Sequence, residues 1–178
     1  MTISVAKTRF TTGATHRLGA AIELCSALTV VSAAAAQTST QITEQNRQLV
    51  SQAFANWAAG GSSFFADMLA PDAVWTIKGS GPTAGSYHGR DDFINRAVKP
   101  FAERMAGPLK PTVRDIWAQG NDVIIHWDGT GTAKDGQPYQ NSYVWIFRMN
   151  GQQATEVIAF LDLGRYDELL NRVKPEAP

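Results

Sequence analysis

The chain has 178 residues, enough for one domain with a substantial core, and 44% of them are hydrophobic. Its formal net charge is zero; residues 37–178 carry 13 basic and 15 acidic side chains, a formal charge of −2. No basic stripe stands out in that part, so nucleic acid is excluded as an expected partner. We see neither an internal repeat nor a second domain.

The N-terminus predicts a secretory signal peptide over residues 1–36. A basic region up to Arg17 precedes an apolar run over residues 18–31, and small residues up to Ala36 offer a cleavage site before Gln37. We therefore expect an exported, periplasmic or secreted protein of residues 37–178 that does not stay at the membrane. Cys25 would be lost, which excludes disulfides and thiol chemistry. The alternative is a disordered extension.

Apolar periodicity and breaker residues predict helices first and strands later along the rest of the chain. The expected helices cover residues 44–59, 63–70, 90–105 and 165–173, with a kink at Pro100 in the third, and Thr43 is the expected cap of the first. The expected strands cover residues 72–78 and 112–118, and the Gly- and Pro-rich residues 79–89 are expected to form a loop. This order indicates an α+β domain.

Residues 121–163 predict a meander of three long antiparallel strands. Asp135-Gly136 and Asn150-Gly151 are dipeptides typical of type I′ hairpin turns. The runs around them are rich in Val, Ile, Tyr, Trp and Phe, which suit pleated, half-buried strands.

Both faces of this meander are largely apolar, so we expect one face to be covered by helices. We assign to the helix side the residues His126, Asn141, Tyr143, Trp145, Phe147, Phe160 and Asp162. Polar groups among aromatic side chains are typical of a small-molecule pocket. The residues expected on the opposite face are Ile125, Trp127, Val144, Ile146, Val157 and Leu161.

Two stretches carry a resemblance to a known family. WTIKGSGPTAGSYHGRDDF, residues 75–93, resembles the W-x-x-P-G-x-x-P-x-A-G-x-Y-x-G pattern of SnoaL-like, ketosteroid-isomerase-related proteins. Residues 118–163 are similar to their long signature, with Y-x-N-x-Y from Tyr139 and E-x-x-x-F-x-D from Glu156. The resemblance covers residues 44–170. It implies a cone-shaped, curved antiparallel sheet wrapped around N-terminal helices, the nuclear transport factor 2-like fold.

The resemblance also implies a proton-transfer role for Asp162, since SnoaL-like cyclases have an acidic acid/base near this place. A carboxyl in an apolar pocket has a raised pKa and exchanges protons near neutral pH. The alternative is that Asp162 caps the C-terminal helix. His126 stands where the family often has Glu, which puts a Glu-dependent role in doubt; it is a candidate partner of Asp162, or else a hydrogen-bonded core histidine.

The remaining candidates are expected to bind substrate or to pack the core. Asn141 and Tyr143 would orient a substrate, or satisfy buried polar groups; the candidate platform is formed by Trp75, Trp145, Phe147 and Phe160. Three scattered histidines predict no metal site, and we expect no cofactor. The resemblance implies a homodimer through the outer sheet face.

Two functions stay open at this point. One is cofactor-free proton transfer on a small hydrophobic carbonyl or hydroxyl compound, as in an isomerase, cyclase or dehydratase. The other is a non-catalytic periplasmic module for ligand binding or dimerisation. A polar Asp162–His126 pair inside the pocket would favour the enzyme, whereas an Asp162 bound to backbone amides would favour the binding module.

Overall fold

The computed structural model describes residues 20–61 and 63–175, and the side chains of residues 38–61 and 63–175. The chain divides into two units, residues 1–38 and 39–178. Helix α1 (Ala20–Ala58) begins in the first unit and ends in the second. Residues 1–19, with the predicted basic region, lie outside the described residues, so the signal peptide and export stay predictions. None of the described helices is both long and apolar enough to cross a membrane.

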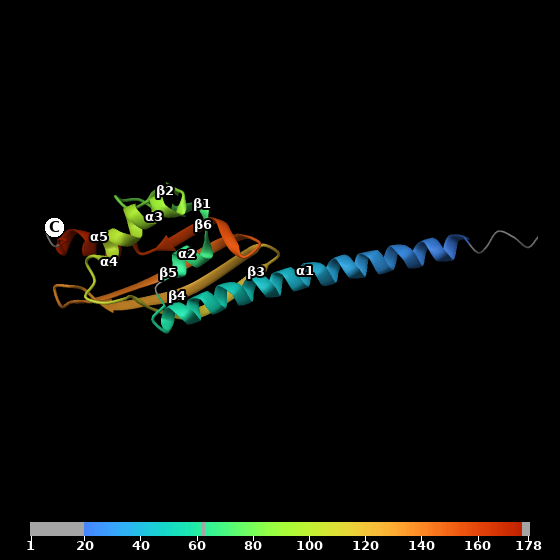
Figure 1. Ribbon diagram of the computed structural model, residues 1–178, viewed down its shortest axis with the longest axis horizontal. Coiled ribbons are helices and arrows are strands. Elements are labelled where there is room, and N and C mark those ends of the chain that lie inside the picture. The colour runs from blue at the N-terminus through green and yellow to red at the C-terminus, as the bar shows by residue number, and fades with distance from the viewer. Residues whose placement is uncertain (1–19, 62, 176–178) are drawn as a thin grey trace, which may run out of the picture. The chain divides into compact units, whose positions relative to one another are not determined.

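A six-stranded sheet is the frame of the second unit (Figure 1). Its strands are β1 (Leu69–Ile77), β2 (Gly85–His88), β3 (Lys110–Gln119), β4 (Asp122–Thr132), β5 (Pro138–Asn150) and β6 (Gln153–Leu161). The spatial order is β2-β1-β6-β5-β4-β3, with β1 and β6 parallel and every other pair antiparallel. The predicted α+β fold and the β4–β5–β6 meander are confirmed. The predicted loop is wrong at residues 85–88, because pairing with β1 makes a strand of them.

The two predicted type I′ turns are also wrong. Among the described residues only glycines have positive φ, so neither Asp135 nor Asn150 supplies the first half of such a turn. Asn150 still pairs with Gln153, and the two-residue loop is Gly151-Gln152 with Gly151 at φ 63°, the pattern of a type II′ turn. The longer β4–β5 loop places Gly136 at φ 82°.

Helices cover one face of this sheet. They are the end of α1, α2 (Phe64–Met68), α3 (Arg90–Phe93), the π-helical turn η1 (Ile94–Val98), α4 (Lys99–Ala102) and, at one end, α5 (Leu163–Arg172). The π turn comes just before Pro100, which lacks a backbone N–H and is the residue at which a kink was predicted. Thr43 does not cap a helix: it lies inside α1, and its hydroxyl accepts a hydrogen bond from the Gly120 N–H.

The strand register separates an inner from an outer face. Inner cross-strand rows consist of Val123-Phe147-Val157-Trp75, Ile125-Trp145-Ala159-Ile77 and Trp127-Tyr143-Leu161. From the helical side, Phe54 of α1, Phe64 of α2 and Phe93 of α3 pack against them. The core is therefore an aromatic layer between sheet and helices, and the predicted faces of β4 and β6 are wrong by one residue.

The crowding of two β4 glycines yields a stability prediction. A Cβ on Gly129 would lie 3.0 Å from both the Tyr143 ring and Leu109, and 3.1 Å from Trp127, all in the packed inner layer. We expect Gly129→Ala to lower the free energy of unfolding by about 1–3 kcal/mol through overpacking. Gly131→Ala is the matched control: its Cβ would meet only the end of the flexible Met105 side chain closely, so its cost should be smaller. Urea denaturation of both variants measures this, and equal losses would contradict it.

Candidate functional site

A cavity of about 430 Å³ lies between the inner face of the sheet and the helices above it. Its floor comes from the sheet residues Trp75, Ile77, Trp127, Tyr143, Trp145, Ala159 and Leu161. Its cover includes Phe64, Phe65, Phe93, Ala97, Phe101, Met105 and Tyr166. Among the described lining residues, which also include the loop segments 60–61 and 106–108, no side chain is charged or carries an imidazole. The cavity is thus apolar and electrically neutral.

Ring packing holds the floor in place. Trp127 and Tyr143 stack with ring centroids 4.0 Å apart, and Trp75 stacks on Phe93 at 4.1 Å. Trp145 lies between these pairs and meets Trp127 and Trp75 edge to face at 4.7 Å and 4.9 Å. Each ring has neighbours on more than one side, which restricts its rotation and gives the cavity a definite shape.

The floor has hydrogen-bond donors without acceptors. The indole nitrogens of Trp75 and Trp127 are buried and have no hydrogen-bond partner in the part of the chain that the structure describes. An unsatisfied buried N–H costs about 1–3 kcal/mol. Tyr166, in contrast, uses its hydroxyl hydrogen, which it donates to the Ala97 carbonyl at 2.9 Å. Because both indole nitrogens are fully buried, we assign neither of them a ligand-binding role, and the Tyr166 hydroxyl is already occupied.

Three polar side chains follow one another along β5 at the end of the cavity. The Asn141 Nδ2 donates to the Tyr139 hydroxyl at 3.0 Å, and the Tyr139 and Tyr143 hydroxyls lie 2.9 Å apart. Burial raises the pKa of Tyr139 and raises that of Tyr143 well above its usual value, so both phenols are neutral near pH 7. They act as hydrogen-bonding groups and not as phenolates.

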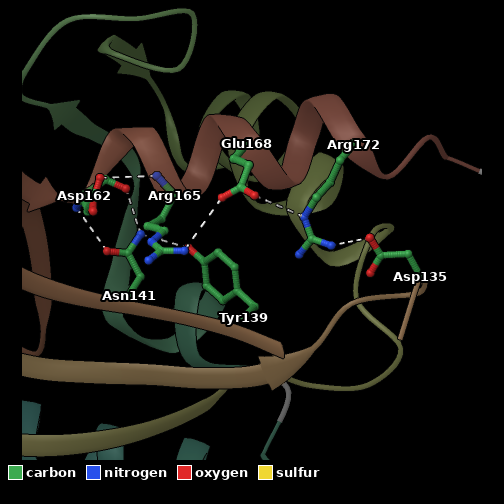
Figure 2. Close-up of polar contacts among 7 residues, drawn as sticks. All are labelled: Asp135, Tyr139, Asn141, Asp162, Arg165, Glu168 and Arg172. Atoms are coloured by element: carbon green, nitrogen blue, oxygen red, sulfur yellow. Dashed lines mark hydrogen bonds and ion pairs between the residues drawn. The ribbon is translucent and has the colours of Figure 1, made fainter. Parts of the chain in front are cut away.

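Asp162 lies outside the cavity, contrary to the prediction. It is the N-cap of α5, its exposed side chain accepts a hydrogen bond from the Arg165 N–H at 3.2 Å, and its backbone is held by Asn141 (Figure 2). The alternative capping role is the one observed. The cause is the pleat: Leu161 points inward as the last residue of β6, so the chain turns outward at Asp162.

His126 lies on the outer face of the sheet, so its predicted face is wrong. It pairs with Val144 on β5 and Asp115 on β3, while its neighbour Trp127 points into the core. The fold therefore does not bring His126 and Asp162 together in the cavity. The polar residues Asp122, His126 and Asp128 share the outer face of β4, whereas Val123, Ile125 and Trp127 share the inner one, so hydrophobic alternation favoured the observed orientation and the choice of His126 as a pocket residue was the error.

The other predicted residues are placed as follows. Trp75, Tyr143 and Trp145 line the cavity; Phe147 is fully buried beside it. Asn141 and Tyr139 are buried on the inner face, do not line the cavity, and border a separate polar groove. Phe160 is 45% exposed on the outer face.

The predicted outer face is wrong in part. Val144 and Ile146 do lie there, but Ile125, Trp127, Val157 and Leu161 point inward.

Sequence reasoning missed several residues of the site. Trp127 was assigned to the wrong face, and Tyr139 was not named as a site residue although the spacing Tyr139-x-Asn141-x-Tyr143 puts all three on one face. Phe93, Phe101 and Tyr166 come from helices whose distance from the sheet no sequence pattern specifies. Within the described residues no cluster of three metal-ligating side chains occurs.

Solved structures with the same fold are numerous. Bal32a, from a soil-derived mobile gene cassette, is 18% identical with a TM-score of 0.61, and the match covers 72% of this chain and 98% of that one. A candidate SnoaL-like polyketide cyclase from Jannaschia sp. CCS1 is 20% identical (TM-score 0.58; 75% and 96% covered). A candidate isomerase from Bacillus subtilis is 13% identical (TM-score 0.59; 74% and 97% covered). At these identities the likeness shows the fold alone. A search of curated proteins finds no match.

The match to a family model is more specific. The model described as a SnoaL-like domain matches residues 50–157, which is more than half of the chain. This range contains β1, β4 and β5 of the cavity floor, the first half of β6, and the helices α2, α3 and α4 above the cavity. The chain therefore belongs to the family of SnoaL-like domains, with the nuclear transport factor 2-like fold.

Proposed function

We propose that this SnoaL-like domain binds a small, mostly apolar molecule that carries a carbonyl or hydroxyl oxygen. The observation that carries the proposal is the neutral, aromatic-lined cavity of about 430 Å³, which falls in the size range of ligand sites. Such a wall excludes charged compounds, because an ion would lose its hydration without gaining a partner charge. Aromatic rings stacked in the floor favour a ligand with a flat ring system.

Binding has better support than acid–base catalysis by the predicted pair. A general acid or base must reach the proton that it transfers within about 2.6–3.2 Å, directly or through one water. Neither Asp162 nor His126 lines the cavity. The names of the cyclase-like and isomerase-like neighbours belong to proteins that are 20% and 13% identical, so they lend little weight to an isomerase, cyclase or dehydratase reaction here.

A matched trio of bicyclic compounds tests the binding proposal. 1-Indanone offers an acceptor only, indole a donor only, and indane neither. We expect all three to bind the full chain in the order 1-indanone, indane, indole, with 1-indanone about two- to tenfold tighter than indane, as one net hydrogen bond predicts. Isothermal titration calorimetry gives the three dissociation constants.

The control is a pair of substitutions on neighbouring residues of β6. Ala159→Leu places extra carbons on the cavity floor and should weaken binding of all three compounds, whereas Ile158→Leu on the outer face should not. Melting temperatures check that both variants fold. If none of the compounds binds the wild type, or if Ala159→Leu and Ile158→Leu behave alike, the cavity is not the binding site.

The role of Asp162 is tested by two substitutions at that position. Asp162→Ala should lower the free energy of unfolding by about 1 kcal/mol through the loss of the helix cap, while Asp162→Asn keeps the cap and should be nearly neutral. Both should retain the 1-indanone affinity of the wild type. Asp91→Ala, on the exposed first turn of α3, is the control for removing a surface carboxylate. A stable Asp162→Asn protein with altered 1-indanone binding would restore Asp162 to the site.

We also propose that the outer sheet face pairs with a second copy of the chain. Its apolar centre is the cross-strand row Trp117-Ile124-Ile146-Ile158 with Val144 and Phe160 beside it. Trp117 is 52% exposed. Charged side chains, including Asp122, Arg148 and Glu156, border this centre in a neighbouring row. An apolar centre with a charged border is the usual anatomy of a protein–protein interface.

Light scattering coupled to gel filtration tests this assembly. We expect the wild type to elute with twice the mass of one chain. Phe160→Glu and Trp117→Glu should give a folded monomer, since each puts a charge into the apolar centre. Ile42→Glu changes an exposed apolar residue of α1 and should leave the mass unchanged. A monomeric wild type, or dissociation caused equally by Ile42→Glu, would refute the proposal.

A further inference from the structure

The series Tyr139, Asn141 and Tyr143 has room on the inner face because β4 has glycines opposite it. Gly131 pairs with Tyr139, and Gly129 pairs with Asn141. A Cβ on Gly129 would approach the Tyr143 ring to 3.0 Å, so only glycine lets this ring lie over the neighbouring strand undisturbed. The two tyrosine hydroxyls meet as a result, with Asn141 between their strand positions.

The orientation of the Asn141 amide is determined by the backbone of Asp162. The Asp162 N–H donates to Asn141 Oδ1 at 3.0 Å, and Asn141 Nδ2 donates to the Asp162 carbonyl at 2.9 Å (Figure 2). A backbone N–H only donates and a carbonyl only accepts, which leaves one possible assignment of the amide oxygen and nitrogen. Nδ2 therefore faces Tyr139 and donates its second hydrogen to that hydroxyl at 3.0 Å.

This assignment sets a direction for the whole series. Either hydroxyl could be the donor of the Tyr139–Tyr143 hydrogen bond, but a hydroxyl that accepts a hydrogen bond becomes a better donor, which favours Tyr139 as the donor to the Tyr143 oxygen. The hydrogen of Tyr143 is then left over. Within the described part of the chain, the Tyr143 hydroxyl makes one hydrogen bond, the one with Tyr139. Tyr143 is also the member of the series that lines the cavity.

We propose that Tyr143 is the hydrogen-bond donor of the cavity, held in that role by Tyr139 and Asn141, and that it binds a carbonyl-type acceptor oxygen of the ligand. Asn141 and Tyr139 are positioning residues, because they act through Tyr143. The inference rests on the proposed binding function and narrows its ligand class to compounds with an acceptor oxygen. Burial raises the pKa of both phenols, which keeps the Tyr143 hydrogen in place as a donor.

The experiment combines affinity with the infrared carbonyl band of bound 1-indanone. We expect Tyr143→Phe to bind indane as the wild type does, but to lose the two- to tenfold preference for 1-indanone. Its bound carbonyl should absorb at higher frequency than in the wild type, since a donated hydrogen bond weakens the C=O bond. Tyr139→Phe should retain a preference but give an intermediate frequency, because its Tyr143 is no longer polarised.

Tyr87→Phe is the matched control. Tyr87 is also a buried tyrosine, but its hydroxyl donates to the Thr83 carbonyl at 2.8 Å and it does not line the cavity, so its loss should change neither the preference nor the carbonyl frequency. If Tyr143→Phe keeps the wild-type preference for 1-indanone over indane and the wild-type carbonyl frequency, this inference is overturned. The proposed function would still stand in that case, provided that indane binds. If neither 1-indanone nor indane binds the wild type, the proposed function fails and this inference fails with it.

Discussion

The domain depends on the packing around Trp145 in the middle of the sheet. Its ring meets Trp127 and Trp75 edge to face and contacts Phe54 of α1 and Phe64 of α2. One side chain thus joins three strands and two helices into a single core. Aromatic contacts of this kind contribute about 0.5–1.5 kcal/mol each beyond the area that they bury. The same wide, rigid rings form much of the wall of the cavity between the sheet and the helices.

The distribution of polarity in the domain follows from the same packing. Charged groups lie outside the inner layer: Asp162 caps α5, and Arg172 pairs with Asp135 and Glu168 at the end of the sheet (Figure 2). Among the described residues that line the cavity no side chain is charged, and the hydroxyl series ends at Tyr143. This division between a charged exterior and a neutral interior is why selective binding of an uncharged compound is the function that the site supports best.

Asp162 has two structural roles. Its side chain caps the N-terminus of α5, and its backbone orients the Asn141 amide, which in turn directs Tyr139 and Tyr143. A short strand–helix junction outside the cavity therefore determines the polarity of a hydroxyl inside it. The outer face of the sheet differs from the inner face in its side chains. Its apolar row and its charged border come from the alternate residues of the same strands.

The sequence by itself determined the α+β class, the meander, and the family, because these depend on local periodicity, breaker residues and motifs that survive without tertiary information. It also placed Tyr143 and Trp145 correctly, since one strand face of β5 is richer in aromatics. Only the tertiary structure decided which face of β6 points inward, because this strand has apolar residues on both faces and Phe160 lies on the outer one. On β4 the polar Asp122, His126 and Asp128 share the outer face, so the sequence favoured an inward Trp127, and the prediction for His126 went against that alternation. The position of Asp162 was likewise decided by where β6 ends and α5 begins, which depends on the hydrogen bonds of Asn141 from a strand 21 residues earlier.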